Sequence, residues 1–86
     1  MEADDSSIIA KVLDGDTEQF GEIVRRYQVG LYRYATSMVG DHDVAADMVQ
    51  DAFVRAYTNL ASCRDRERFR LWLFRTLRNR CFDYLK

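Results

Sequence analysis

The clearest helical pattern in this 86-residue chain is Asp43-Val-Ala-Ala-Asp-Met-Val-Gln-Asp-Ala-Phe-Val-Arg-Ala-Tyr57. Its apolar residues recur every three or four positions and continue to Leu60, as expected when one face of an α-helix is buried. Asp41 or Asp43 is placed to cap the first turn. The pattern therefore predicts an amphipathic helix over residues 43–60, with one face in a core and the other in contact with solvent or a partner.

The same helical period continues on both sides of this segment. It predicts three further helices, over residues 6–14, 17–39 and 66–85. The expected N-caps of these helices are Ser6 or Ser7, Thr17 and Asp65. Their apolar faces, together with that of the helix over residues 43–60, include Leu13, Tyr57, Cys81, Tyr84 and Leu85. We therefore expect one all-α domain over residues 1–86, a compact bundle of about four helices.

Composition excludes several other classes of protein. The chain has no proline and four glycines, too few for an all-β domain with many tight turns. No apolar run approaches the roughly 20 residues of a membrane span, and the acidic N-terminus does not resemble a signal peptide. The two cysteines lack CxxC spacing, so neither a zinc site nor a disulfide framework is expected, and a reducing cytoplasm is the default location.

Motifs for catalysis are also missing from the sequence. His42 is the only histidine and lies at an expected helix start. There is no glycine-rich phosphate loop, no HExxH motif and no nucleophile elbow. Asp47 and Asp51 are one helical turn apart, but no third metal ligand is evident near them. We therefore expect no enzyme activity, no cofactor and no metal.

Charge is divided unequally along the chain, although the net charge is only −1. Residues 1–53 hold four Lys/Arg and eleven Asp/Glu, whereas residues 54–86 hold nine Lys/Arg and three Asp/Glu. Such asymmetry favours one face for a polyanion and another face for a different partner. Two solvated faces that attract each other within the fold explain the same division, so both interpretations stay open.

The helix over residues 43–60 carries a continuous surface strip outside its apolar face. At spacings of three and four, this strip contains Asp47, Gln50, Asp51, Val54 and Arg55. One interpretation is a solvated helix face. The other is a docking strip for a helix of another protein, which an exposed valine between polar residues favours slightly.

Arginines gather in the last third of the chain. Seven lie within seventeen positions, with no lysine among them: Arg64, Arg66, Arg68, Arg70, Arg75, Arg78 and Arg80. Guanidinium groups bind phosphates in a bidentate way and stack on bases. On a helical wheel, Arg68, Arg75 and Arg78 share one side, with Trp72 and Asn79 at its edge. Basic, aromatic and amide groups in this arrangement suit single-stranded nucleic acid.

Simpler interpretations of single residues in this region also stand. Trp72 by itself is explained by core packing, and Arg70 and Arg80 by solvated or ion-paired side chains. Cys63 lies among arginines, which predicts a lowered thiol pKa and leaves a redox role open. Cys81 is expected in the core.

Two segments together carry a resemblance to a known family. They are Asp43–Tyr57, quoted above, and Phe69-Arg-Leu-Trp-Leu-Phe-Arg-Thr-Leu-Arg-Asn79 with Asp83. They resemble region 2 of the bacterial RNA polymerase sigma factors, in particular the extracytoplasmic-function group. Upstream, Phe20–Tyr27 and Leu31–Ala35 resemble the preceding helices of that region, so the resemblance covers about residues 6–86.

The resemblance implies two binding surfaces on a helical domain. The first docks on the clamp helices of the polymerase largest subunit through Asp47, Gln50 and Asp51, with Val54 and Arg55 as neighbours. The second recognises the promoter −10 element and holds its melted non-template strand, with a pocket for a flipped base in the link at about residues 60–68. The implied DNA-binding residues are Asn59, Leu60, Ser62, Arg64, Arg68, Trp72, Arg75, Arg78 and Asn79. Asp83 would orient Asn79 or an arginine one turn away.

The chain departs from the family in two places. Primary sigma factors carry two adjacent aromatics that wedge the duplex open, whereas this chain has Trp72-Leu73, as in the extracytoplasmic-function group. Melting is then expected to depend more on capture of the flipped base. The chain also stops at Lys86, so we expect it to be excised from a longer protein with a C-terminal helix-turn-helix domain.

Two other functions remain as alternatives. The helix faces would chiefly bind an anti-sigma regulator if contact with DNA has been lost; such a regulator is also an expected partner of a working sigma factor. An ordinary helix-turn-helix regulator of duplex DNA is less favoured, because no short glycine-containing turn joins two short helices as that motif requires.

Overall fold

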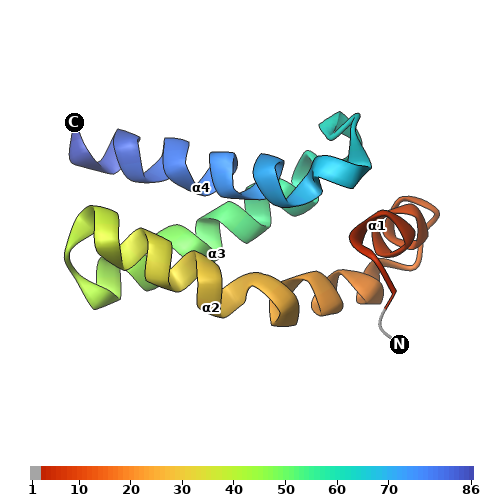
Figure 1. Cartoon of the computed structure of the whole chain (residues 1–86), viewed down its shortest axis with the longest axis horizontal. Helices are drawn as coiled ribbons and strands as arrows, with labels where there is room; N and C mark the ends of the chain where they lie inside the picture. Colours follow the sequence, from red (N-terminus) through yellow and green to blue (C-terminus); the bar gives the residue numbers. More distant parts are fainter. Residues whose placement is uncertain (1–2) are drawn as a thin grey trace.

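The computed structural model describes residues 3–86, which form helices and connecting turns with no strand among them (Figure 1). The α-helices are α1 (Asp5–Leu13), α2 (Phe20–Val39), α3 (His42–Thr58) and α4 (Phe69–Leu85). Three short 3-10 helices complete the fold, namely η1 (Thr17–Gln19), η2 (Leu60–Ser62) and η3 (Arg66–Arg68). The predicted all-α bundle of four helices is therefore confirmed.

The helices differ in how they are arranged. α2 and α3 form an antiparallel pair joined by a tight turn, and α4 packs along both (Figure 1). α1 crosses the far end of the bundle, where it contacts α2, η2 and η3 (Figure 1). None of the helices in residues 3–86 combines the length and apolar character needed to span a membrane.

Short polar residues and glycine fix where these helices begin and end. Asp41 caps α3, because its Oδ1 accepts hydrogen bonds from the backbone N–H groups of Asp43 at 2.9 Å and Val44 at 3.0 Å. Gly40 ends α2 with φ of 74°, a left-handed conformation that glycine adopts without strain. The turn between α2 and α3 is therefore encoded by two adjacent residues.

The other expected caps were placed wrongly. Asp4 caps α1, since its carboxylate accepts from Ser7 N at 2.8 Å, and the serines lie inside the helix. Thr17 begins the 3-10 helix η1, so α2 starts at Phe20. Asp65 precedes η3 without a side-chain capping bond and instead forms an ion pair with Arg68 at 3.5 Å.

The core collects the apolar faces of all four α-helices. The fully buried positions include Ile8 and Ile9 of α1, Ile23 and Leu31 of α2, Ala45, Ala52 and Ala56 of α3, and Phe69, Leu73, Leu77 and Cys81 of α4. Each fully buried large apolar side chain contributes about 1.5–3 kcal/mol. The buried alanines of α3 allow its neighbours α2 and α4 to approach closely.

Four apolar residues expected on the buried faces are substantially exposed. Leu13 and Tyr57 are 40% and 44% exposed, and Tyr84 and Leu85 are 48% and 50% exposed. All four lie in the last turn of a helix. The helical period therefore identified the buried faces correctly but extended them too far, because burial of a terminal turn depends on what packs beside it.

Candidate nucleic-acid and protein-binding surfaces

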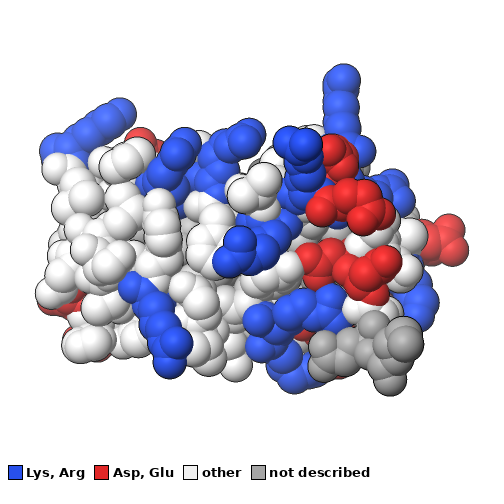
Figure 2. Space-filling view, in the orientation of Figure 1, with Lys and Arg blue, Asp and Glu red and all other residues white. Residues whose placement is uncertain are grey.

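Charged side chains gather on different parts of the molecule. In the orientation of Figure 1, basic side chains follow the edge formed by α4 and acidic side chains gather around the α1 end, with further basic side chains over α2 (Figure 2). Of the seven clustered arginines, Arg80 alone is only partly exposed; the other six are exposed. The arginine-rich segment thus presents most of its charge to solvent, where contact with a polyanion is possible.

The outer face of α3 is accessible over most of the predicted docking strip. Asp47, Gln50 and Arg55 are exposed, and Val54 is 58% exposed. We call the five residues Asp47, Gln50, Asp51, Val54 and Arg55 the α3 strip. Four of its members are exposed to solvent, as the expected docking face requires.

Asp51 is the exception within the α3 strip. Its Oδ2 accepts hydrogen bonds from Arg55 Nε at 2.7 Å and from Arg80 Nε at 2.8 Å. Only 36% of its side chain is exposed. Asp51 therefore joins α3 to α4 within the same molecule. Arg80 is ion-paired, which agrees with the simpler of the two interpretations that the sequence allowed for it.

A cavity of about 180 Å³ lies between the link and the first turns of α4. It is lined by Cys63, Arg64, Asp65, Arg68, Leu71, Trp72 and Arg75. We call it the link cavity. Four of these seven residues belong to the predicted DNA-binding set. Cys63 and Asp65 lie within the link expected to form a pocket but were not singled out as DNA-binding residues, and neither was Leu71 of α4.

Trp72 also borders a second cavity of about 180 Å³, between the end of α3 and α4. This α3–α4 cavity is lined by Arg55, Asn59, Trp72, Thr76, Asn79, Arg80 and Asp83. Sequence analysis did not include Thr76 or Arg80 in the DNA-binding set. The spacing of residues 72, 76, 79 and 83 along one helix face was the available signal for Thr76.

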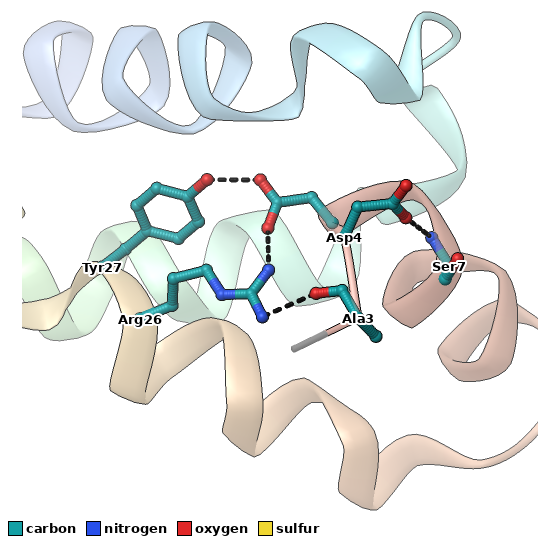
Figure 3. Close-up of polar contacts among 6 residues, drawn as sticks. Ala3, Asp4, Ser7, Arg26 and Tyr27 are labelled. Atoms are coloured by element: carbon teal, nitrogen blue, oxygen red, sulfur yellow. Dashed lines mark hydrogen bonds and ion pairs between the residues drawn. The ribbon is translucent and has the colours of Figure 1, made fainter. Parts of the chain in front are cut away.

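The position of the link depends on α1 and on a polar latch at its start. Asp5 accepts hydrogen bonds from Arg26 Nη1 at 2.7 Å and from the Tyr27 hydroxyl, and Arg26 also donates to the Ala3 carbonyl (Figure 3). The latch ties α1 to α2. Since α1 contacts η2 and η3, the latch also supports the segment that carries the link cavity.

Aromatic contacts continue from the latch to Trp72. The ring of Tyr27 lies 6.1 Å from that of Phe69, and Phe69 lies 5.7 Å from Trp72. Trp72 is partly buried against the core. The Trp72 side chain therefore packs against the core and also borders both cavities.

Three expectations for this region need correction. Leu60 is 2% exposed, because it anchors the link in the core, and its side chain is not available to DNA. Asp83 forms an ion pair with Lys86 at 3.7 Å and no hydrogen bond with Asn79 in the described residues. Burial raises the pKa of the Cys63 thiol and the Asp65 charge adds to this, whereas Arg66 opposes it, so the expected lowering is wrong.

Two arginines of α4 lie over aromatic rings of the same helix. The guanidinium carbon of Arg70 is 4.9 Å from the centre of the Phe74 ring, and that of Arg78 is 5.8 Å from the Phe82 ring. Such contacts restrain an arginine without neutralising it. Arg78 is exposed beside its ring. No group of three metal-ligating side chains is found within residues 3–86.

An apolar groove of about 450 Å³ lies between α2 and α3. It is lined by Gln28, Val29, Tyr32, Arg33, Ala46 and Val49. Val29 is 57% exposed there. Ala46 and Val49 of the groove are sequence neighbours of Asp47 and Gln50, so the groove and the α3 strip lie on adjoining parts of α3.

The described residues thus define a class of all-α helical module that carries an arginine-rich helix and, on another helix, the exposed α3 strip. Residues 23–86 match the family described as Sigma-70 region 2. The chain therefore belongs to the sigma-70 region 2 family. No solved structure shows significant similarity to it.

Curated relatives agree with this family. The ECF RNA polymerase sigma factor SigW of Bacillus subtilis is 35% identical over 78 residues, which are 91% of this chain and 42% of that protein. The ECF RNA polymerase sigma-E factor of Haemophilus influenzae is 33% identical over 81 residues, 94% of this chain and 42% of that protein. The sigma-E factor of Escherichia coli K12 is 36% identical over 81 residues, with the same coverage of 94% and 42%.

These comparisons bear on two expectations from the sequence. The resemblance to region 2 of the extracytoplasmic-function group is confirmed. The relatives are named as sigma factors, which agrees with the expectation that the chain is not an enzyme. The chain spans less than half the length of these relatives.

Proposed function

We propose that this chain acts as the region 2 domain of a transcription initiation factor of the extracytoplasmic-function group. In this proposal the α3 strip binds the clamp helices of the RNA polymerase largest subunit. The link and α4 then recognise the promoter −10 element and hold its melted non-template strand. Family membership and the two accessible surfaces support the proposal.

The α3 strip supplies the polymerase contact. Gln50 and Asp47 offer hydrogen-bonding groups, and Val54 offers an exposed apolar side chain between them and Arg55. An apolar contact surrounded by polar groups is the usual arrangement of a protein interface. Asp51 contributes mainly by holding Arg55 and Arg80, because its carboxylate is already bound.

The link and α4 supply the DNA contact. Arg64, Arg68 and Arg75 line the link cavity beside Trp72, so phosphate-binding groups surround a space beside an aromatic side chain. Stacking a base on an aromatic side chain contributes about 1–3 kcal/mol, comparable to the few kcal/mol that base unstacking costs. Ser62 and Asn59 are exposed near the ends of η2 and extend this surface, whereas Leu60 is excluded from it.

The observation that carries the proposal is that exposed arginines and the partly buried Trp72 line the same cavity beside α4. A direct test replaces Arg75 and Arg78 together by glutamine and titrates single-stranded DNA containing the −10 element. Each lost phosphate contact should lower the slope of log affinity against log salt by about 0.7, so the pair should lower it by about 1.4. Arg33→Gln on α2 is the matched control, because Arg33 is also exposed but belongs to a different helix from Arg75 and Arg78.

An unchanged salt slope in the Arg75 and Arg78 variant would contradict DNA binding by α4. That result would favour the second candidate, a module whose main partner is an anti-sigma regulator. The apolar groove between α2 and α3 is the observation that favours a protein partner of this kind. Retained regulator binding by the same variant would then identify the groove side as the main functional surface.

A further inference from the structure

The link cavity has two walls that come from different parts of the chain. Cys63, Arg64 and Asp65 of the link form one wall with Arg68 of η3, and Leu71, Trp72 and Arg75 of α4 form the other. A binding site of this kind discriminates between ligands only when its groups are held at fixed distances from each other. The contacts that hold the link in place therefore bear directly on what the cavity can select.

The hydrogen bonds of the link do not attach it to another helix. Backbone N–H groups of the link, at Ser62, Cys63 and Arg68, donate to carbonyls three residues earlier at distances between 2.8 and 3.0 Å. These bonds shape the turns η2 and η3. Attachment comes instead from the burial of Leu60 and Cys63, which are 2% and 4% exposed, and from α1, which contacts both η2 and η3.

The position of α1 depends in turn on the latch to α2. α1 has nine residues, fewer than the roughly 12–15 that an isolated helix needs to be stable in water. At its start, Asp5 accepts from Arg26 Nη1 at 2.7 Å and from the Tyr27 hydroxyl (Figure 3). The Arg26 and Asp5 side chains are 22% and 18% exposed, so water screens this ion pair less than one on the surface. α1 and the link lie at the same end of the bundle (Figure 1), so loss of the latch would loosen the helix that the link contacts.

Tyr27 is connected to both walls of the link cavity. Its hydroxyl holds Asp5 and therefore, through α1, supports the link wall. Its ring centroid lies 6.1 Å from that of Phe69, which lies 5.7 Å from that of Trp72 in the other wall. We infer that Asp5 and Tyr27 are positioning residues, which set the distance between the two walls and thereby the selectivity for the base that enters the cavity. Only the identity of this occupant rests on the proposed function.

Alkylation of the two cysteines tests the latch without DNA. Cys63 lines the link cavity, whereas Cys81 is 0% exposed in the core and should react only when the whole chain unfolds. Iodoacetamide is added to the folded 86-residue chain, and peptide mass mapping follows the reaction rate of each cysteine. Tyr27→Phe and Asp5→Ala should each raise the Cys63 rate about tenfold, because a hydrogen bond to a charged group no longer opposes opening of the link.

Two control variants separate the latch from general stability and from charge. Ala35→Gly places a glycine inside the half of α2 that lies away from α1 (Figure 1), which destabilises the whole fold. It should raise the Cys81 rate and leave the Cys63 rate unchanged, because local opening of the link does not involve that half of α2. Asp4→Asn removes a charge beside Asp5 but keeps a group that can cap α1, so neither rate should change.

Single-stranded DNA tests the selectivity. A library of randomised heptadeoxynucleotides is bound to the unmodified chain, and sequencing of the bound fraction gives the preferred heptamer. Fluorescence of Trp72, the only tryptophan, then compares this heptamer with its single-base variants. Tyr27→Phe should lower the preference at the most selective position about fivefold, in the range for residues that act through others. The salt dependence of binding should be unchanged, because no phosphate contact is removed, and Ala35→Gly should keep the preference.

The outcomes separate the latch from the proposed function. If the unmodified chain binds no single-stranded DNA at low salt, the proposed function fails and the selectivity fails with it, whereas the cysteine rates still decide whether the latch holds the link. An unchanged Cys63 rate in the latch variants, or an equal rise of that rate in Ala35→Gly, would overturn the positioning role. A raised Cys63 rate with an unchanged base preference would overturn the role in selectivity and leave the proposed function standing.

Discussion

Tyr27 is the residue at which the polar latch meets the aromatic core. Its hydroxyl donates to Asp5, and its ring contacts Phe69 and Phe74. Burial raises the pKa of Tyr27 to about 12, and the hydrogen bond to Asp5 and the charge of Asp5 act in the same direction. One side chain therefore joins α1 to α2 and supports the side chain on which Trp72 packs.

The raised pKa of Tyr27 predicts a loss of stability in strong base. Because the folded state holds the proton more tightly than the unfolded chain, this stability is fully present below about pH 10 and is lost as pH rises toward 12. Tyr27→Phe should lower the free energy of unfolding at pH 7 by about 1.5 kcal/mol, the value for a hydrogen bond to a charged group. Urea unfolding of both proteins across this pH range measures the effect.

Comparison of the two proteins isolates Tyr27 from the other groups that titrate in base. The unmodified chain should lose more stability between pH 10 and pH 12 than the Tyr27→Phe variant, so their difference should shrink. Tyr84→Phe is the control, since Tyr84 is 48% exposed. A constant difference across this range would show that the Tyr27 hydroxyl does not titrate as described.

Cys63 shows how burial can reverse an expectation based on sequence neighbours. Neighbouring arginines at 64 and 66 predicted a lowered thiol pKa, but the side chain is 4% exposed. Desolvation opposes the thiolate more strongly than Arg66 favours it. The thiol also lies near the Asp65 carbonyl, at 3.7 Å. Cys63 is thus a packing residue of the link.

At the scale of elements, α3 has three distinct faces. Buried alanines pack in the core, the exposed residues of the α3 strip meet solvent, and Asp51 at the border binds α4. The contact between Asp51 and Arg80 spans 29 residues of sequence. The orientation of α4 relative to α3 is therefore fixed partly by a charged pair at the edge of the proposed DNA surface.

A double-mutant cycle on Asp51→Asn and Arg80→Gln should measure this connection. We expect a coupling free energy of about 0.5–1 kcal/mol, since both side chains are partly exposed. A parallel cycle with Arg55→Gln should give about 0.3–0.5 kcal/mol, the range for a pair within one helix. Chemical denaturation of the single and double variants provides the values, and a coupling near zero between Asp51 and Arg80 would refute the bridge.

At the scale of the whole molecule, two proposed surfaces meet at one residue. Arg55 belongs to the α3 strip and also lines the α3–α4 cavity beside Trp72. The remaining exposed strip residues, Asp47, Gln50 and Val54, do not line either cavity bordered by Trp72. Changes at Asp47, Gln50 or Val54 should therefore affect polymerase binding alone, whereas changes at Arg55 should affect binding of both polymerase and DNA.

Replacement of Gln50 by alanine with Val54 by aspartate should separate the two activities. The placement of a charge at an exposed apolar contact should weaken binding to polymerase core by about tenfold or more. Binding to single-stranded −10 DNA should be unchanged, because neither residue borders the cavities. Arg55→Gln should weaken both. Competition for polymerase core and Trp72 fluorescence provide the two measurements, and undiminished polymerase binding by the double variant would show that α3 is not the docking helix.

The sequence by itself determined the four α-helices, the interior of their buried faces and the division between the α3 strip and an arginine-rich segment. These features depend on spacings of three and four residues, and such spacings are visible along the chain. The turn at Gly40 and Asp41 was also predictable, because a left-handed backbone and helix capping are local properties of the residues involved. The family resemblance rests on the same local patterns.

Only the tertiary structure decided what the border residues do. Leu60 was predicted on the DNA surface and lies in the core, and Asp51 was predicted as a docking carboxylate and holds Arg80. The two cavities that share Trp72 are formed by residues from the link, α3 and α4. Such contacts arise from the packing of helices distant in sequence, and a helical period carries no information about which neighbouring side chain meets a residue at the edge of its buried face.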